Sequence, residues 1–511
     1  MNRKIKQKLA ARKRRIAQRL DKTRYEGDSP VLSASNVQYE ISDRIHATAA
    51  GGLGMIHQMV KRLELDQAIN RRLPVFKFYL PYSESDHVLN IAYNLLAGGT
   101  CLDHLELRRQ DEVYLDALGA RRIPDPTTAG DFCRRFSSLQ IDRLMDIFNH
   151  TRVKVWQQQD AGFFAEAIIE ADGTMVETTG ECKQGIDINH KGQWGYHPLL
   201  ISLANTAEPL FILNRSGNRP SHEGAAPYLD RAVTLCRQAG FRKIVLRGDT
   251  DFTQTEHLDR WHEDGVKFVF GIDAMPNLYQ IVEELPDKAW RRLRRRKKKE
   301  VKTIPRGRKE NVKEAVVERR EFQNITLADE YVAEFRYRPV ACTRTYRVVV
   351  LWKDLEVLEG QRKLFDDTRC FFYITNDEER TAEQVVFQAN DRCNQENTVI
   401  QQLKSGVHAL AAPLDNLLSN WAYMVIASLA WSLKIWSALL LPVRPQCKES
   451  DVREKKRLLR MEFPTFRQAW IALPAQIVRT SRRIIYRLLA WNPWQEAFFR
   501  LLDVLHVPQR C

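Results

Sequence analysis

The sequence lacks the patterns that mark secreted proteins, zinc modules and nucleotide-binding loops. Its nine Cys residues are scattered and no two stand at a CxxC spacing, which argues against a disulfide framework or a zinc site. No apolar h-region follows the N-terminal charges, so we expect no secretory signal. A Gly-rich phosphate loop and a nucleophilic Ser or Cys elbow are also missing from the sequence. The scattered thiols indicate a reducing compartment, and we expect a cytoplasmic protein.

Acidic residues are too few to balance the basic ones. Among 511 residues, 79 Lys and Arg stand against 64 Asp and Glu, which gives a formal net charge of +15. A surplus of this size indicates a polyanionic partner, most often nucleic acid and less often an acidic membrane surface. The composition, with 44% hydrophobic and 28% charged residues, is that of a folded globular protein. Its length suggests about three domains.

One segment is apolar enough to raise the question of a membrane span. Residues 417–441 are mostly apolar, but Ser419, Asn420 and Lys434 interrupt the run. The Trp residues in it are spread along the segment rather than gathered at two interfaces. We therefore interpret the segment as a helix buried in a large core, and we expect no membrane insertion.

The N-terminal third is basic at its start and then helical. Residues 2–24 hold eleven Lys or Arg against one Asp, which favours a phosphate-binding helix over the alternative of a solvated tail. Between about 45 and 160, helical pieces are separated by glycines and by the turn at 123–128. Asp125 or Thr128 is suited to cap the helix that follows. A helix-turn-helix reader and an ordinary small bundle both fit this pattern.

From about residue 164 the pattern changes to alternating strands and helices. We expect a strand at 165–172, a hairpin over 195–215, a helix at 222–239, and strands at 243–249 and 267–272 with a helix between them. This order builds a mixed sheet with helices on its faces, so we predict an α/β fold.

A β-rich stretch follows, and it begins with a dense cluster of positive charge. Residues 291–299 hold eight cations in nine positions. Runs within 314–376 alternate apolar and charged residues, which is typical of an antiparallel sheet with one wet face. We interpret these runs, at 314–322, 330–339, 346–352 and 370–376, as strands of a block inserted into the mixed domain. We expect a long helix from about Arg380 to Ser405 after them.

Three acidic residues are placed so that they could share a metal ion. Asp172 and Asp249 each end a buried strand, and Glu396 lies on the late helix. If the two strands are neighbours, carboxylates converging at their ends form an all-oxygen site suited to Mg²⁺. Two such ions can flank a phosphodiester. Glu170 and Asp251 are rivals at the same strand ends, and a single acid at such a position is usually a cap or a turn residue.

Four sequence segments help to decide among these acids. The phrases EADGTMVETTG, KGQWGYHPLLISLA, LRGDTDF and NDRCNQENTVIQQLKSG, in this order, resemble the catalytic core of bacterial insertion-sequence DDE transposases. The resemblance is narrowest to the 1380 subgroup, whose RNase H-like core is interrupted by a β-strand insertion. It covers about residues 165–410.

The resemblance implies an RNase H-like mixed sheet with an inserted β-rich subdomain, flanked by N-terminal and C-terminal helical regions. The expected regions are a basic arm at 1–44, a helical DNA-binding region at 45–160, the first part of the catalytic core at 161–289, the β-rich insertion at 290–375, the Glu-bearing helix of the core at 376–410 and a helical C-terminal region at 411–511. The insertion found independently in the β-rich stretch lies between Asp249 and Glu396, where the resemblance requires it.

By the same resemblance, the catalytic and metal-binding residues are Asp172, Asp249 and Glu396, with Mg²⁺ as cofactor and Mn²⁺ as an alternative. Arg392 fits the family's Tyr-x-x-Arg-x-x-x-Glu signature. Ala389 replaces the usual Tyr, and Lys404 falls one residue later than the usual Lys. The expected DNA-binding residues are Arg392, Lys404, Trp352, Arg12, Lys13, Arg14, Arg15, Arg294, Arg295, Arg296, Lys297 and Lys298.

Some of these roles have structural alternatives. Arg392 and Lys404 could contact phosphates near the cleaved bond or could be exposed helix charges. Trp352 could stack on a distorted base at a DNA end, or it could pack in a core, which is the commoner role for a Trp in an apolar strand. For His197 we favour a structural hydrogen bond over metal ligation.

The activity implied is DNA transposition. The protein would bind the terminal inverted repeats of its element as a homodimer in a synaptic complex, near the bacterial nucleoid. It would cleave at the element ends and join the 3′-hydroxyls to target double-stranded DNA. The alternatives are a Mg²⁺-dependent RNase H-like nuclease or resolvase without strand transfer, and an inactive DNA-binding derivative. The presence of all three acids disfavours the inactive derivative.

Overall fold

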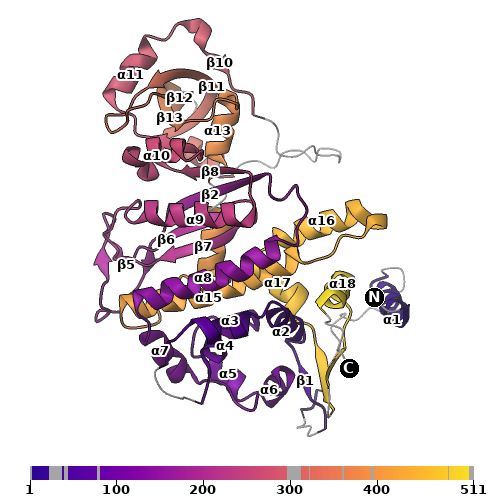
Figure 1. Cartoon of the computed structure of the whole chain (residues 1–511). Helices are drawn as coiled ribbons and strands as arrows, with labels where there is room; N and C mark the ends of the chain where they lie inside the picture. Colours follow the sequence, from indigo (N-terminus) through magenta and orange to yellow (C-terminus); the bar gives the residue numbers. More distant parts are fainter. Residues whose placement is uncertain are drawn as a thin grey trace.

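The computed structural model describes nine stretches of the chain (Figure 1). They are residues 3–21, 37–39, 44–76, 81–295, 312–320, 323–359, 362–392, 396–480 and 483–505. Within them, the side chain of Glu396 lies outside the described residues, as do those of several residues near the ends of the insertion strands.

A mixed sheet runs through the middle of the molecule, with the strand order β10-β11-β12-β13-β9-β8-β2-β6-β7. In its core, β2, β8 and β9 are parallel to one another, while β6 and β7 are antiparallel to their neighbours. Three antiparallel strands followed by two parallel ones form the RNase H-like order, so the predicted fold class is confirmed. The bounds are β2 Glu166–Gly173, β6 Leu199–Leu203, β7 Glu208–Leu213, β8 Lys243–Gly248 and β9 Lys267–Ile272.

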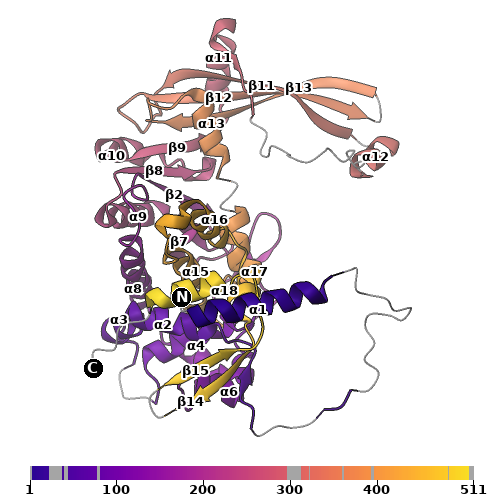
Figure 2. The ribbon, with the colours of Figure 1, turned by 90° about the vertical axis from the view of Figure 1, so that its right-hand side faces the viewer.

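The strands of the β-rich stretch extend this same sheet instead of forming a separate one. β13 pairs with β9, through Phe372–Thr375 against Val269–Ile272, and the ribbon of β11 to β13 then projects far beyond the core (Figure 2). The bounds are β10 Arg291–Arg292, β11 Gln323–Tyr337, β12 Tyr346–Glu359 and β13 Arg362–Thr375.

One strand predicted in this stretch is wrong. The run at 314–322 contributes to a helix, α12, which spans Val312–Arg319. Ala, Glu, Lys and Arg all favour helices, and the alternation of so short a run does not separate a helix from a strand.

Helices pack against the sheet and against its edge strand β7. α9 (Ala225–Ala239) ends at Gly240, which has a left-handed φ of 104° and stops the helix as the sequence predicts. α8 (Ser138–Trp156) and α15 (Leu417–Leu439) lie side by side and both contact β7 (Figure 1). The other helices beside the sheet are α10 Leu258–Glu263, α11 Pro276–Glu283 and α13 Ala382–Asn390.

α15 is the helix that the sequence marks as strongly apolar. Within the described ranges it is the one helix long and apolar enough to cross a membrane, and its most apolar window is entirely buried inside this chain. Its start is fixed by Asn416, whose side chain accepts a hydrogen bond from the Ser419 amide at 2.9 Å. The helix therefore forms part of the core of the chain, as its interrupted apolar pattern predicts.

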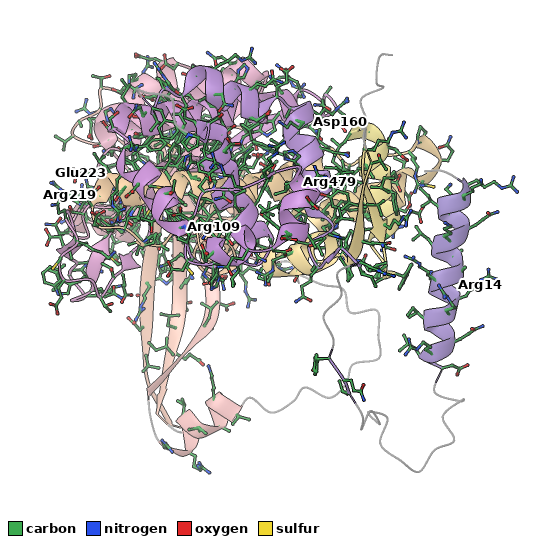
Figure 3. The ribbon with its side chains drawn as sticks, turned by 90° about the horizontal axis from the view of Figure 1, so that it is seen from below. Arg14, Arg109, Asp160, Arg219, Glu223 and Arg479 are labelled. Carbon is green, nitrogen blue, oxygen red and sulfur yellow. The ribbon has the colours of Figure 1, made fainter. Side chains whose placement is uncertain are left out.

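The N-terminal helices pack beneath the sheet. Asp125 caps α7 by accepting a hydrogen bond from the Thr128 amide at 2.8 Å, which confirms one of the two predicted caps. The bounds are α2 Leu53–Arg62, α3 Leu65–Arg72, α4 Glu84–Leu96, α5 Leu105–Arg109, α6 Glu112–Leu118 and α7 Pro126–Arg134. α1 (Arg3–Arg19) lies at the side of this body, as seen from below in Figure 3.

The C-terminal region is not helical throughout, in contrast to the prediction. A hairpin of β14 (Ala475–Arg479) and β15 (Ile484–Leu488) pairs with β1 (Ala47–Thr48) near the start of the chain. Three helices surround this hairpin in the sequence: α16 Lys448–Leu459, α17 Phe463–Phe466 and α18 Gln495–Leu505.

Candidate active site at the ends of β2 and β8

Two neighbouring parallel strands bring Asp172 and Asp249 to the same edge of the sheet. β2 and β8 pair in parallel with Glu170 opposite Arg247. Asp172 and Asp249 each follow two residues later, and side chains two residues apart share a face of a strand. The equal spacing on both strands therefore places the two aspartates on one face, just past the paired region.

A single arginine contacts both aspartates. Arg392 Nη1 lies 3.4 Å from Asp172 Oδ2 and 3.3 Å from Asp249 Oδ2, so the two oxygens are separated by no more than the sum of these distances. The side chains are 13% exposed for Asp172 and 32% for Asp249, so both still reach solvent. A cavity of about 520 Å³ lies over them, lined by Asp172, Gly173, Thr174, Asp249, Arg392, Ile400, Gln401, Lys404 and Ser405.

Asp249 is held by the turn that follows β8. Its side chain accepts a hydrogen bond from the Asp251 amide at 3.2 Å and caps the short turn Thr250–Phe252. Burial raises the pKa of Asp249 above its ordinary value, the charge of Asp251 raises it further, and Arg392 opposes both. Such a carboxyl is partly desolvated and only loosely paired, which is a common property of functional acids.

The two rival acids have other surroundings. Glu170 is 2% exposed and is bonded to Arg247, whose Nε donates to Glu170 Oε1 at 2.8 Å. Asp251 is exposed on the turn after Asp249. Neither residue lines the cavity, so the strand ends present Asp172 and Asp249 to it.

The segment that carries Glu396 is not the regular helix that the sequence predicts. α13 ends at Asn390, residues 393–395 lie outside the described residues, and two π-helical stretches follow at Glu396–Ile400 and Gln402–Gly406. The predicted convergence of the Glu396 carboxylate with the aspartates concerns a side chain outside the described residues, so it stays a prediction.

Lys404 lies on the second of these π-helical stretches. A π turn closes with an i→i+5 bond and so takes up one residue more than an α turn. Although Lys404 follows Glu396 by one residue more than in the signature that the sequence resembles, it still lines the cavity. Its Nζ donates to the Met175 carbonyl at 2.7 Å and to Thr174 Oγ1 at 3.3 Å, and burial lowers its pKa.

The donor set suits a hard divalent cation. The described lining offers two carboxylates, the hydroxyls of Thr174 and Ser405 and the amide of Gln401, and it contains no Cys or His. No group of three His, Cys, Asp or Glu side chains placed to hold a metal occurs among the described residues, which leaves out Glu396. With Arg392 and Lys404 beside the carboxylates, the cavity pairs metal-binding oxygens with cations that suit phosphate oxygens.

The basic residues predicted to bind DNA fall into different environments. Arg12 donates to the Leu488 carbonyl at 2.9 Å, so it holds α1 against β15. Lys13, Arg14 and Arg15 are exposed, and Figure 3 shows Arg14 on α1 at the rim of the molecule. Within the cluster after β10, Arg294 is exposed, Arg295 forms an ion pair with Glu330 at 2.5 Å, and Arg296, Lys297 and Lys298 lie outside the described residues.

Trp352 is packed within the insertion. Its ring lies edge-on to Trp290 with centroids 5.4 Å apart, and its indole N–H donates to Asp354 Oδ1 at 2.8 Å. Of the eleven Trp residues, all of which are described, Trp194 is the exposed one, at 53%. It lies on β5 (Trp194–Tyr196), opposite Ile188, which is 41% exposed.

Trp194 is close in the fold to the cavity. β5 forms a small sheet with β3 (Val176–Glu177) and β4 (Asp187–Ile188), and β3 begins directly after Met175, the residue that Lys404 contacts. Nothing in the sequence around Trp194 marks this exposure. A Trp between polar and Gly residues in a short strand has no periodicity that separates a buried ring from an exposed one.

His197 makes the structural hydrogen bond that the sequence favoured. Its Nδ1 donates to the Arg219 carbonyl at 3.1 Å, and its ring lies against Gly173, where a Cβ atom would be 2.9 Å from His197 Cε1. Burial lowers the pKa of His197, and Arg215 lowers it further. The ring therefore packs beside the end of β2 and needs a glycine there.

A family model described as "Transposase DDE domain group 1" matches residues 30–509, which is most of the chain. No curated protein matches the sequence. Among solved structures, one match is a piggyBac transposase synaptic complex with hairpin DNA, which is 11% identical, covers 81% of each chain and has a TM-score of 0.34. A TM-score this low does not establish a shared fold, and the fold assignment follows from the strand order.

Proposed function

Because the chain belongs to the family of DDE transposases, domain group 1, we propose that it is a DNA transposase of an insertion sequence. It binds the terminal inverted repeats of its element, cleaves the DNA at the element ends and joins the 3′-hydroxyl ends to target DNA. The observation that carries the proposal is the matched placement of Asp172 and Asp249 on β2 and β8, beside a polar cavity that also holds Arg392 and Lys404.

The acids have a common task in this proposal. Asp172, Asp249 and Glu396 would hold Mg²⁺, or Mn²⁺ in its place, which when bound activates the attacking oxygen and stabilises the leaving one. The two aspartates are already gathered around one nitrogen of Arg392, so little side-chain ordering is needed to bring both to one cation. The two aspartates lie at the ends of β2 and β8, and these strands give the carboxylates a rigid support.

The basic residues of the cavity orient the DNA backbone. Arg392 and Lys404 present positive charge within the same cavity as the carboxylates, where phosphate oxygens next to the cleaved bond would lie. Farther away, Lys13, Arg14, Arg15 and Arg294 are exposed and can neutralise phosphates without sequence preference, and we extend this role to Arg296, Lys297 and Lys298. Arg12 and Arg295 already have protein partners, so they contribute to shape more than to DNA affinity.

We also propose that the active form is a homodimer bound to two DNA ends in the bacterial cytoplasm, close to the nucleoid. The resemblance to the 1380 subgroup belongs to the same proposal, and the long ribbon of β11 to β13 supports it because it lies in the chain between the second aspartate and the glutamate. Base stacking by Trp352 at a DNA end remains a candidate role, for which the exposed Trp194 is a rival.

The principal alternative is a Mg²⁺-dependent RNase H-like nuclease or resolvase. A strand-transfer assay with precleaved element ends and supercoiled target separates the two functions. The transposase proposal predicts joined product that requires Mg²⁺ or Mn²⁺. Cleavage of uncut ends without any joining would favour the nuclease. DNA binding without either reaction would favour the inactive derivative.

A further inference from the structure

A buried ion pair lies two residues before the two aspartates on the same two strands. Glu170 is 2% exposed and Arg247 is 4% exposed, and they are register partners across β2 and β8. Arg247 Nε donates to Glu170 Oε1 at 2.8 Å, and Nη2 also contacts this oxygen. Because Asp172 and Asp249 each lie two residues further along, the ion pair and the aspartates share one face of the sheet.

Arg247 uses its remaining nitrogen to hold a helix end. Its Nη1 donates to the backbone carbonyl of Gln388 at 2.7 Å. Gln388 lies in the last turn of α13, where carbonyls have no partner within the helix. Arg247 therefore fastens the C-terminal end of α13 to the sheet, next to the site.

The fastened turn leads directly to Arg392. The Arg392 amide donates to the Ala389 carbonyl at 3.2 Å, so Arg392 is still part of the turn that follows Gln388. From there its Nη1 reaches Asp172 Oδ2 and Asp249 Oδ2. A continuous chain of contacts thus runs from Glu170 through Arg247 and the end of α13 to the arginine between the aspartates.

The ion pair is poorly explained as a device for stability alone. Removing two charges from water costs several kcal/mol per ion, and apolar residues of similar volume often support a fold equally well. We propose that Glu170 and Arg247 are positioning residues, which fix the end of α13 over the sheet and so hold Arg392 between Asp172 and Asp249. The consequence for DNA joining rests on the proposed function, whereas the anchoring of α13 does not.

The anchoring is tested by hydrogen–deuterium exchange on the full-length protein, which needs no DNA and no activity. The double variant Glu170→Leu/Arg247→Met removes the pair without leaving a lone buried charge. We expect exchange of the amides at 389–392 to become about tenfold faster, because their opening no longer breaks the Arg247 contact, while the amides of α9 change less than about twofold. Unchanged protection at 389–392 would overturn the proposal.

Two further variants keep the test decisive. Arg247→Lys retains the charge opposite Glu170 but cannot bridge to Gln388, so it should show the same local increase in exchange. It replaces the double variant as the test if that variant does not fold. Arg347→Met is the matched control, since Arg347 is also a buried arginine that contacts a glutamate, Glu334, and backbone carbonyls, but on the N-terminal side of α13. Faster exchange at 389–392 in this control would show that any buried arginine has the effect, and so would contradict a specific role for Arg247.

The consequence for the reaction is read from a double-mutant cycle on strand transfer. If Arg247 acts through Arg392, combining Arg247→Lys with Arg392→Ala should cost no more than Arg392→Ala alone, within about twofold. Independent, multiplying losses would contradict this route. Absence of joining by the wild-type protein would refute the proposed function while leaving the exchange result to decide the anchoring.

Discussion

Two carboxylate sites in this molecule differ in their burial and in whether they face a cavity. Glu208 is 0% exposed, and four donors saturate it. Its Oε1 accepts from Arg152 Nε and Trp436 Nε1, both at 3.0 Å, and its Oε2 accepts from Trp156 Nε1 at 2.9 Å and Thr206 Oγ1 at 2.6 Å. This cluster joins α8, β7 and α15 within the core.

The aspartate pair at the ends of β2 and β8 is partly exposed instead, at 13% for Asp172 and 32% for Asp249. Arg392 contacts Asp172 and Asp249 at 3.4 and 3.3 Å, and both carboxylates face a cavity of about 520 Å³. A saturated buried carboxylate has no capacity left for a ligand and serves the fold. A carboxylate that faces a cavity can still be reached by a ligand, which is why we assign function to the second site and stability to the first.

The largest effect should come from neutralising the two aspartates that line the cavity. Asp172→Asn and Asp249→Asn keep the shape of each side chain but remove a charge that a divalent cation requires. We expect each to lower the rate of strand transfer by about a thousandfold or more, equivalent to about 4 kcal/mol, without a change in the thermal midpoint beyond about 2 °C. Joining rates on precleaved ends, together with thermal melts, measure both quantities.

Asp251→Asn is the matched control for these variants, because Asp251 is exposed on the same turn and does not line the cavity. A loss of joining in Asp251→Asn as large as that in Asp249→Asn would mean that the wrong acid of the turn has been assigned.

The opposite outcome is expected at the saturated site. Glu208→Leu leaves Arg152 buried without its carboxylate and should lower the free energy of unfolding by about 3–5 kcal/mol. The double variant Glu208→Leu/Arg152→Met should recover much of this loss. Urea denaturation followed by circular dichroism measures the difference, and equal stability of Glu208→Leu and the wild type would remove the distinction between the two sites.

The two tryptophans considered for base stacking, Trp194 and Trp352, should differ in the same way, one in DNA binding and the other in stability. Trp194 is exposed at the small sheet beside the cavity, whereas Trp352 packs on Trp290. If an unstacked base lies against Trp194, Trp194→Ala should weaken binding of element ends by about 1–3 kcal/mol with little change in stability. Trp352→Ala should mainly lower the thermal midpoint. Fluorescence anisotropy with labelled ends tests this, and the reverse pattern would restore Trp352 as the DNA contact.

The smallest effect is a pH dependence of stability, which we expect from a lysine buried in the same core as Glu208. Lys434 on α15 is 0% exposed, donates to the Leu459 carbonyl at 2.6 Å, and has its pKa lowered by burial from 10.5 to about 7. Between these two values the unfolded chain binds more protons than the folded one, so this residue makes stability rise with pH by about 1 kcal/mol per unit. Lys434→Met should abolish that rise.

Denaturant unfolding at pH 7, 8 and 9 measures the effect as a difference between variant and wild type. Lys13→Met, at an exposed position on α1, serves as the control and should leave the slope unchanged. A wild-type slope that matches that of Lys434→Met would mean that Lys434 is not neutral in the core.

The sequence was most informative where strand ends and short spacings decide the outcome. Asp172 and Asp249 could be placed at one sheet edge because each ends an apolar run. The end of the helix at Gly240 could be placed because a glycine readily adopts the left-handed conformation that stops a helix. The buried pair below the aspartates could also have been found, since Glu170 and Arg247 have the same separation in sequence as the two aspartates.

Other features depend on packing that a linear pattern does not contain. The run at 314–322 alternates like a strand, yet its first part belongs to helix α12. Arg295 belongs to a basic cluster, but Glu330 of β11 neutralises it across the sheet. The pairing of β14 with β1 joins residues more than four hundred positions apart, and nothing in either segment marks the partner.

We propose that Asp172, Asp249 and Glu396 hold the same divalent ions, and metal-directed cleavage of the protein tests this directly. Fe²⁺ bound in place of Mg²⁺ generates hydroxyl radicals in the presence of ascorbate and peroxide, and these cut the nearby backbone, with the cuts mapped by mass spectrometry. We expect cuts close to residues 172, 249 and 396 together, which disappear with excess Mg²⁺ and in Asp172→Asn. Cuts that spare the region of any of the three, or that persist in Asp172→Asn, would contradict it.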